Sequence, residues 1–224
     1  MKVVFYLNHN GRARHVHGAV VQGLARHALT ITTRHPSEFK QTGVEADIAV
    51  FYGLWAELKT IQRAYPAAGR TSILLDLGYW GRVEGGKLEG YHRISVNDLH
   101  ATSYFQRVKH PPDRFNHFNI RRRPMRQEGS FILLCGMSSK AAWVYDLRPE
   151  EWERKAVETI RVHSKVQRPI LYRPKQSWKE ARPIPGTIFA PDDGLLGERE
   201  LADCWALVTH HGNTGLDALV NGVP

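Results

Sequence analysis

The chain has 224 residues, of which 42% are hydrophobic, 24% charged and 10% aromatic, and this composition excludes a disordered, collagen-like or coiled-coil protein. The length allows one large domain or two small ones. No apolar run approaches the roughly 20 residues that span a bilayer, so the sequence argues against an integral membrane protein. Cys135 and Cys204 are too few for a disulfide framework, and a reducing cytoplasm is the expected location.

The formal net charge of +9 is distributed unevenly along the chain. Residues 1–112 carry 14 Lys/Arg and 8 Asp/Glu, residues 113–129 carry 5 and 2, and residues 130–224 carry 12 of each sign. The whole excess therefore lies in the first 129 residues. A partner that is anionic, most commonly nucleic acid, would favour such an asymmetry. The alternative is a basic surface that only keeps the protein in solution.

Predicted strands and helices alternate in the first half of the chain. Short apolar runs rich in β-branched and aromatic residues predict strands at 3–7, 29–33, 47–51 and 72–76. The first of these follows the N-terminus without a small-residue cleavage site, so we interpret it as a strand and not as a signal peptide. Apolar residues at three-and-four spacing predict helices at 16–28 and 55–65, and Pro66 and Gly69 are expected to end the second.

Residues 109–129 are rich in proline and arginine and have no apolar period, which predicts a domain boundary. We therefore expect an N-terminal domain at 1–112, a basic linker at 113–129 and a C-terminal domain at 130–224. The alternation then restarts. The predicted strands of the second half are 131–135, 169–173, 187–190 and 205–209, and the predicted helices are 150–164, 198–204 and 214–220.

Continuous apolar strands that alternate with helices are typical of parallel sheets covered on both faces. The fold class predicted is α/β, with two small Rossmann-like doubly wound domains that face a cleft. Ligands of such sheets bind at the carboxyl ends of the strands.

The last segment carries the most specific pattern. The final predicted strand ends at Thr209, and a turn with His210 and His211 leads into a helix that Asn213 or Thr214 can cap. Free backbone N–H groups at such a helix start would receive a phosphate well. The competing interpretation is an ordinary strand–turn–helix without a ligand.

Residues 205–224 resemble the donor-binding end of GT-B glycosyltransferases, in which a strand, a turn rich in His, Ser and Gly, and a helix ending in Ala-Leu-x-x-Gly-x-Pro hold a nucleotide sugar. The likeness is greatest to the capsule-polysaccharide type and to phage-encoded, DNA-modifying relatives. Residues 131–140 resemble the strand and loop that open the donor domain, and Arg-Pro-Ile-Leu-Tyr-Arg-Pro-Lys at 168–175 resembles a strand of the same domain. Residues 76–82 and 91–97 resemble the acceptor-domain core.

The likeness covers most of residues 70–224 as short dispersed motifs, with two departures. Lys175 stands where the family has His, so a charge would replace an imidazole there. The sequence stops at Pro224, where GT-B proteins continue into another strand and a closing helix. Either a minimal sheet or a truncated chain is expected.

The resemblance implies a donor site that needs neither a metal nor a cofactor. Arg173, Lys175 and the helix start would neutralise the diphosphate as the sugar–phosphate bond breaks. The adjacent pair Asp192–Asp193 lies in a Pro-Asp-Asp-Gly context that favours a turn over a metal site. The residues predicted to bind the donor are Gly136, Ser138, Arg173, Lys175, His210, His211, Asn213, Thr214 and Asp217. For Asp217, a contact to the ribose and a place on a polar helix face are equal alternatives.

On the acceptor side, a general base must take a proton from the attacking hydroxyl. Asp76, at the predicted carboxyl end of a strand, is the first candidate for this role, and a structural role in accepting backbone N–H bonds is its alternative. His9, after the first strand, is the second candidate.

Two groups of residues are candidates for contact with nucleic acid. Tyr79, Trp80 and Arg82 could stack on or grip a base, although aromatic residues at such spacing are also common in cores. The run Arg121, Arg122 and Arg123 could contact phosphates or form a solvated linker.

These observations together predict a small, metal-independent GT-B glycosyltransferase that moves a sugar from a nucleotide-sugar donor to a hydroxyl acceptor. The favoured acceptor is a hydroxymethylated base in phage DNA, which places the enzyme in the host cytoplasm. The alternatives are a capsular or lipid-linked saccharide acceptor, and a nucleic-acid-binding module without catalysis.

Overall fold

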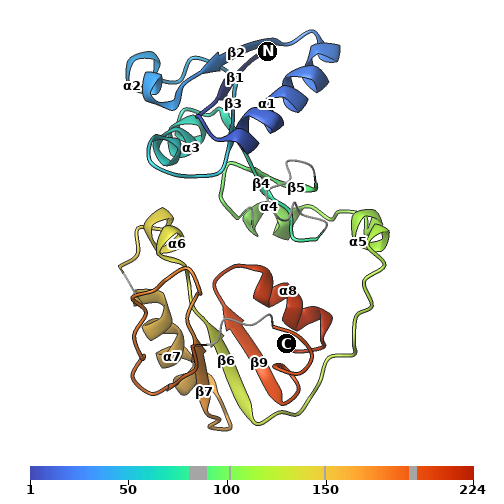
Figure 1. Cartoon of the computed structure of the whole chain (residues 1–224), viewed down its shortest axis with the longest axis vertical. Coiled ribbons are helices and arrows are strands. Elements are labelled where there is room, and N and C mark those ends of the chain that lie inside the picture. The colour runs from blue at the N-terminus through green and yellow to red at the C-terminus, as the bar shows by residue number, and fades with distance from the viewer. Residues whose placement is uncertain (81–89, 101, 149, 192–195) are drawn as a thin grey trace. The chain divides into compact units, whose positions relative to one another are not determined.

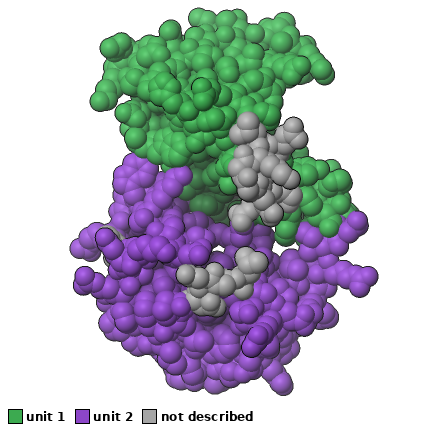
Figure 2. All heavy atoms as spheres, viewed as in Figure 1, with its two compact units in different colours: residues 1–118 green, residues 119–224 purple. Residues whose placement is uncertain are grey.

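The structure is a computed structural model that describes residues 1–80, 90–100, 102–148, 150–191 and 196–224. The chain forms two compact units, Met1–Phe118 and Asn119–Pro224 (Figure 1, Figure 2). The division falls inside the predicted linker 113–129. Within the described ranges, no helix is both long and apolar enough to cross a membrane.

Unit 1 is an α/β unit with a five-stranded sheet in the order β2-β1-β3-β4-β5. Its elements are β1 (Lys2–Tyr6), α1 (Gly11–Leu24), η1 (Ala25–His27), β2 (Thr30–Arg34), η2 (Pro36–Glu38), α2 (Phe39–Thr42), β3 (Ile48–Tyr52), α3 (Glu57–Ala67), β4 (Thr71–Leu77), β5 (His92–Val96), α4 (Thr102–Arg107) and α5 (Asp113–His117). Pro66 was expected to end α3, but it lies in the last turn of that helix, which Ala68 and the left-handed Gly69 terminate.

Helices cover both faces of the unit 1 sheet because alternate strand residues point to opposite sides. Val3 and Phe5 of β1 pack with Ala13 and Val16 of α1 on one face. Tyr6 points to the other face, where its ring centroid lies 6.4 Å from that of Tyr65 in α3 and the two hydroxyls are 3.4 Å apart. This burial on two faces explains why β1 and β3 are continuous apolar runs.

The unit 1 sheet is mixed, whereas the sequence pattern predicts a parallel one. Strands β1 to β4 are parallel, but β5 runs antiparallel to β4, with Asp76 opposite Arg93. The N–H of Gly78 donates to the C=O of Tyr91 at 2.9 Å and so extends the pairing beyond β4. A Cβ at Gly78 would lie 2.7 Å from that carbonyl oxygen, so the close approach of the two segments requires glycine.

Unit 2 is an α/β unit with a four-stranded parallel sheet in the order β8-β7-β6-β9. Its elements are β6 (Phe131–Cys135), α6 (Ser139–Val144), α7 (Glu151–His163), β7 (Ile170–Arg173), β8 (Ile188–Phe189), β9 (Cys204–Thr209) and α8 (Asn213–Val220). On one face, Leu133 and Cys135 pack with Ala218 of α8. On the other face, Leu134 of β6 packs in a second core cluster with Val157 of α7.

The helix predicted at 198–204 is wrong, because these residues form turns and Cys204 begins β9. The guanidinium of Arg126 donates through Nη1 to the carbonyl oxygens of Leu201 (2.7 Å), Ala202 (2.5 Å) and Cys204 (3.4 Å). A side chain from the linker thus takes up carbonyls that a longer helix would use for its own bonds.

The second part of the predicted linker is bound to unit 2. Arg123 N–H donates to Val220 C=O at 2.9 Å, and Arg126 N–H donates to Gly222 C=O at 2.8 Å. A Cβ at Gly222, whose φ is +73°, would lie 2.2 Å from the carbonyl oxygen of Pro124. Residues 123–126 therefore belong structurally to the end of α8, whereas the first linker residues form α5 of unit 1.

Candidate functional site

The strand order of unit 2 creates a topological switch point between β6 and β9. The chain leaves β6 toward β7 and β8 on one side, whereas β9 pairs with β6 on the other side. Open α/β sheets bind ligands outside the carboxyl ends of the strands at such a point. The segments that meet there are the loop after Cys135 and the turn after Thr209, because these two residues are partners in the pairing of β6 with β9.

The loop after β6 is fixed by a buried carboxylate. Glu153 of α7 is 1% exposed and accepts the N–H of Met137 at 2.7 Å. Burial raises the pKa of Glu153. A Cβ at Gly136 would lie 3.1 Å from the ring and hydroxyl of Tyr172 and 3.3 Å from Oε1 of Glu153, so the packing accounts for glycine here. Ser138 caps α6 by accepting the N–H of Ala141 at 3.1 Å.

The turn after β9 places the two histidines against aromatic side chains. The ring of His210 lies 4.7 Å from that of Tyr145 and 5.6 Å from that of Trp152, both edge-on. Its Nδ1 is 3.0 Å from Nδ1 of His211. Burial lowers the pKa of His210, so the neutral ring is favoured. The hydroxyl of Thr209 donates to the C=O of His211 at 3.1 Å and closes the turn.

Helix α8 begins at this turn without a side-chain cap, because its N-cap residue is Gly212 with φ of +119°. Asn213 and Thr214 are the first two residues of the helix. A Cβ at Gly215 would lie 3.2 Å from the methyl group of Thr209, so α8 approaches β9 closely. The start of the helix therefore presents backbone N–H groups at the switch point.

Arg173 is the last residue of β7, the neighbour of β6, and Lys175 follows the strand. The C=O of Arg173 accepts the N–H of Gly136 at 2.9 Å. Burial raises the pKa of the Cys135 thiol to about 11, whereas a hydrogen bond with Thr214 and the charges of Arg173 and Lys175 act in the opposite direction. These interactions bring residues of β7 and α8 together around the end of β6. Asp217 lies one turn further along α8, and its C=O accepts the backbone N–H and the side-chain amide of Asn221.

Sequence reasoning missed the residues that hold this arrangement in place. Glu153 faces the loop from a helix that showed an apolar stripe and acids at its start, and Tyr145, after α6, and Trp152 of α7 pack on His210. An acidic residue at the start of a helix is typical of a favourable helix dipole, so its pattern gave no indication of burial.

The candidate general bases lie in unit 1. Oδ1 of Asp76 accepts the N–H of Leu77 at 2.8 Å, and its Oδ2 is 3.4 Å from Nη2 of Arg93 on β5. His9 follows β1 and is exposed, with its ring 5.4 Å from that of His35. The structure thus gives Asp76 a backbone contact and a cation as partners.

Tyr79 and Trp80 line a groove of about 650 Å³ on unit 1. Its other lining residues come from β5, α4 and α5 and include Tyr91, Arg93, Phe105 and Arg114. Neither Tyr91 nor Phe105 was predicted as a site residue. The helical pattern at 102–107 is short, and β5 was not predicted as an element, so no periodic signal marked them.

Buried polar atoms without hydrogen-bond partners gather in unit 1. Among the described residues, five buried side-chain atoms lack a partner, and four are in this unit: Nε of Arg12, the hydroxyl of Tyr52, Nε2 of His92 and Nε of Arg93. The rings of Tyr52 and His92 are 5.8 Å apart. Burial raises the pKa of Tyr52 and lowers that of His92. Buried polar groups without a hydrogen-bond partner are unusual in folded proteins.

The three consecutive arginines are exposed. Nη2 of Arg123 is 2.5 Å from Oε2 of Glu198, which makes this residue part of an ion pair in unit 2. Arg121 and Arg122 remain candidates for contact with phosphates. Arg82 and the pair Asp192–Asp193 lie outside the described residues.

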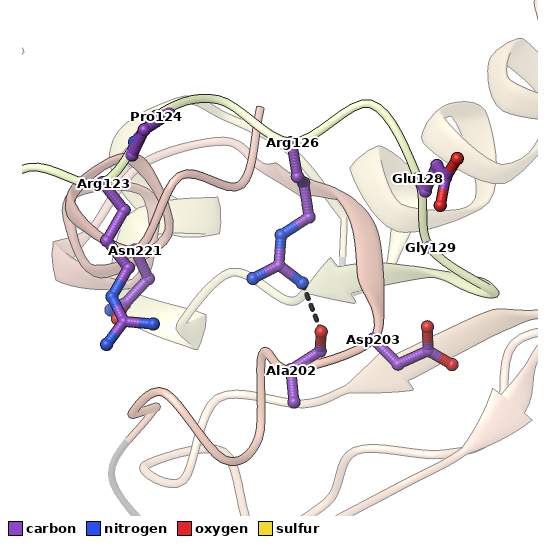
Figure 3. Close-up of a pocket in the computed structure, with 8 residues that line it drawn as sticks. All are labelled: Arg123, Pro124, Arg126, Glu128, Gly129, Ala202, Asp203 and Asn221. Atoms are coloured by element: carbon purple, nitrogen blue, oxygen red, sulfur yellow. Dashed lines mark hydrogen bonds between the residues drawn. The ribbon is translucent and has the colours of Figure 1, made fainter.

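A second hollow, of about 620 Å³, lies at the amino-terminal ends of β6 and β9 (Figure 3). Arg126 points across it toward Ala202, to which it is hydrogen-bonded. Gly129 and Asp203, which line the hollow, precede the two strands. It therefore lies at the opposite edge of the sheet from the switch point, and its principal charged group is already occupied by carbonyl oxygens.

In the part of the chain that the structure describes, no three His, Cys, Asp or Glu residues are grouped to hold a metal ion. Comparison with protein-family models gave no match, and no curated protein matches this chain. The geometry of the two units is consequently the basis for the function proposed next.

Proposed function

We propose that the chain is a metal-independent glycosyltransferase of the GT-B type, with the nucleotide-sugar donor on unit 2 and a hydroxyl acceptor on unit 1. The favoured acceptor is a hydroxymethylated base in DNA, and the expected setting is the cytoplasm, that of the host if the protein is phage-encoded.

The observation that carries the proposal is the uncapped start of α8 at the switch point of unit 2. A helix start with free N–H groups and a positive dipole end attracts a diphosphate. Arg173 and Lys175 add two positive charges at the carboxyl end of the neighbouring strand. Together these groups would stabilise the negative charge that develops on the diphosphate when the sugar leaves.

The acceptor side is argued from the charge of the first half of the chain and from the groove of unit 1. The basic excess of residues 1–129 favours an anionic acceptor, and the groove beside Tyr79 and Trp80 has a size typical of small-molecule sites. A base within duplex DNA would have to be flipped out of the helix to react.

Transfer of radiolabelled sugar tests the activity. Each of several nucleoside-diphosphate sugars is incubated with the full chain and with hydroxymethylated DNA, unmodified DNA or an acidic polysaccharide. We expect label on hydroxymethylated DNA only. Label on the polysaccharide would redirect the proposal to a saccharide acceptor, and salt-sensitive DNA binding without any transfer would indicate a binding module.

Lys175→Gln and Lys179→Gln form a matched pair for the donor side, since both lysines are exposed and only the first is placed at the donor site. Loss of a charge that the transition state needs should reduce kcat/KM about tenfold or more in the first variant and leave the second near the wild type. Equal rates in the two variants would remove Lys175 from the site.

Asp76→Asn and His9→Gln separate the two candidate bases. If Asp76 takes the proton, its variant loses turnover while DNA affinity changes little, and His9→Gln stays active. The reverse pattern would assign the role to His9. Retained turnover in both would show that neither residue is the base.

A further inference from the structure

The groove of unit 1 has walls from four segments of the chain. They are the turn after β4 with Tyr79 and Trp80, β5 with the preceding Tyr91, α4 with Phe105, and α5 with Arg114. Its volume of about 650 Å³ is sufficient for a nucleoside but too small for a duplex.

Some aromatic side chains of the groove are held by their neighbours. The ring of Trp80 lies 5.5 Å from that of Phe115 and 6.0 Å from that of Phe118. The hydroxyl of Tyr91 is 2.9 Å from Nε2 of His117, and its ring is 5.1 Å from that of Phe118. These contacts restrict the rings before any ligand arrives, so little side-chain freedom remains to be lost on binding.

The same groove nevertheless leaves large aromatic surface in contact with solvent. Tyr91 is 52% exposed and Phe105 is 57% exposed, although both are large apolar side chains. Exposed aromatic rings on a restrained framework are typical of surfaces on which planar ligands stack.

The charged residues of the groove favour an anionic strand. Arg93 and Arg114 line it together with Asp113. Arg93 is directed to Asp76, whereas Arg114 is exposed on α5 beside the exposed rings. A cation next to stacking rings suits a phosphate that follows a stacked base.

We propose that this groove binds an unpaired base of a nucleic-acid strand, with the base on Tyr91 and Phe105 and an adjacent phosphate at Arg114. The inference deepens the acceptor side of the proposed function and rests on it for the identity of the strand. A base within a duplex is covered on both faces by its neighbours, so stacking on protein rings requires a base that is single-stranded or flipped.

Fluorescence anisotropy of the full chain with a labelled 15-nucleotide oligodeoxythymidine tests the proposal. The competitors are the same strand paired with oligodeoxyadenosine, an abasic strand of equal length and heparin. We expect the single strand to bind at least tenfold more tightly than the abasic strand, which has the same charge but no bases. Equal affinity for these two strands, or equal competition by heparin, would show purely electrostatic binding and overturn the proposal.

Variants locate the binding on the groove. Phe105→Ala and Tyr91→Ala should each weaken single-strand binding about tenfold, as loss of one stacked base does in such proteins. The matched control is Trp143→Ala, because Trp143 is 42% exposed but lies on α6 of unit 2. Affinity unchanged in both groove variants, or reduced equally in the control, would contradict the proposal.

Arg114→Gln has Arg26→Gln as its control, since both arginines are exposed in unit 1 and only Arg114 lines the groove. The first variant should reduce the slope of log affinity against log salt by about one phosphate contact.

If Tyr91→Ala lowers the melting temperature through its bond to His117, Tyr91→Phe, which keeps the ring, should bind like the wild type. A loss in Tyr91→Phe equal to that in Tyr91→Ala would show that the hydroxyl, and not the stacking ring, determines affinity.

The binding assay contains no sugar donor, so it is independent of catalysis. Stacking on the groove without sugar transfer would retain this inference and remove the glycosyltransferase. Sugar transfer to DNA that Phe105→Ala and Tyr91→Ala leave unchanged would retain the enzyme and remove the groove as its acceptor site.

Discussion

The two units have similar layers but differ in how many of their buried polar atoms have hydrogen-bond partners. In unit 2, the carboxylate of Glu153 accepts the N–H of Met137, and the guanidinium of Arg126 donates to three carbonyls. In unit 1, the described residues include four buried polar atoms without a partner, on Arg12, Tyr52, His92 and Arg93. Buried polar atoms without a partner are thus concentrated in unit 1, on α1, β3 and β5, whereas the described part of unit 2 has one, the hydroxyl of Tyr172.

This difference affects each unit in its own way. The hydrogen bond from Met137 to Glu153 fixes the loop after β6, so the switch point of unit 2 is preorganised on this side. A buried polar atom without a partner costs free energy in the folded state, so the four atoms lower the stability of unit 1.

Glu153→Ala is the largest test of the bracing in unit 2. Removing the carboxylate leaves the Met137 N–H unpaired in a buried site and opens a small cavity, which should cost about 3 kcal/mol. Hydrogen exchange of peptides from β6 measures the loss for this unit alone. Glu153→Gln keeps an acceptor oxygen and should change protection by less than about 1 kcal/mol. Similar effects of both variants would show that the hydrogen bond is not the stabilising element.

The charge of Glu153 also predicts a pH dependence. Burial raises the pKa of this carboxyl in the folded state, so its contribution to stability is present at low pH and decreases as the pH rises through that pKa. Urea denaturation of unit 2 between about pH 4 and pH 8 should show this decrease in the wild type and not in Glu153→Gln. A slope retained in the Gln variant would assign it to another group.

Arg126→Ala should destabilise unit 2 by about 2 kcal/mol, because several charge-assisted bonds to backbone carbonyls are lost at once. Arg121→Ala is the control, since this arginine is exposed in the same segment. Hydrogen exchange of β9 peptides in increasing urea measures the loss of stability in both variants. A loss as large in the control would mean that net charge, and not the carbonyl contacts, holds the linker to unit 2.

Tyr52→Phe should change the stability of unit 1 by less than about 1 kcal/mol, because the hydroxyl has no hydrogen bond of good geometry and only the guanidinium of Arg12 acts on it. Tyr6→Phe should instead cost about 1 kcal/mol, since it removes the contact between the two buried hydroxyls of Tyr6 and Tyr65. Thermal unfolding of the two variants compares them directly. A larger loss in Tyr52→Phe than in Tyr6→Phe would show that the Tyr52 hydroxyl is bonded in solution.

His92→Gln has the smallest expected effect. Burial depresses the pKa of His92 in the folded state, so its stabilising contribution is present above about pH 6.5 and is lost as the pH falls through the folded-state pKa. The variant should flatten the acid side of the stability curve, whereas His27→Gln, at an exposed position on η1, should not. Identical curves for both variants would refute a buried neutral His92.

Sequence patterns predicted the parallel strands well because buried strands are continuous apolar runs; β6, for example, has the bounds expected. They failed where long-range contacts decide the structure. β5 pairs antiparallel through the close approach at Gly78, and the turns at 198–203 are held by Arg126 from a distant segment. Neither contact leaves a periodic signal.

The candidate donor residues follow predicted strands, so their proximity at one sheet edge could be expected from topology. The contacts of Glu153 and Tyr145 that hold the site could not be expected, because packing between elements positions these two residues. In unit 1, Tyr91 and Phe105 belong to elements too short or too irregular for a pattern to mark.

The central claim is that the start of α8 holds the diphosphate of a nucleotide sugar. Asn213→Pro tests it most directly, because proline is tolerated at the first position of a helix and removes one N–H there. Isothermal calorimetry with a panel of nucleoside-diphosphate sugars compares this variant with the wild type. The account predicts that the wild type binds at least one donor and that Asn213→Pro binds it at least tenfold more weakly at unchanged melting temperature. No binding to any donor, or equal affinity in both proteins, would contradict it.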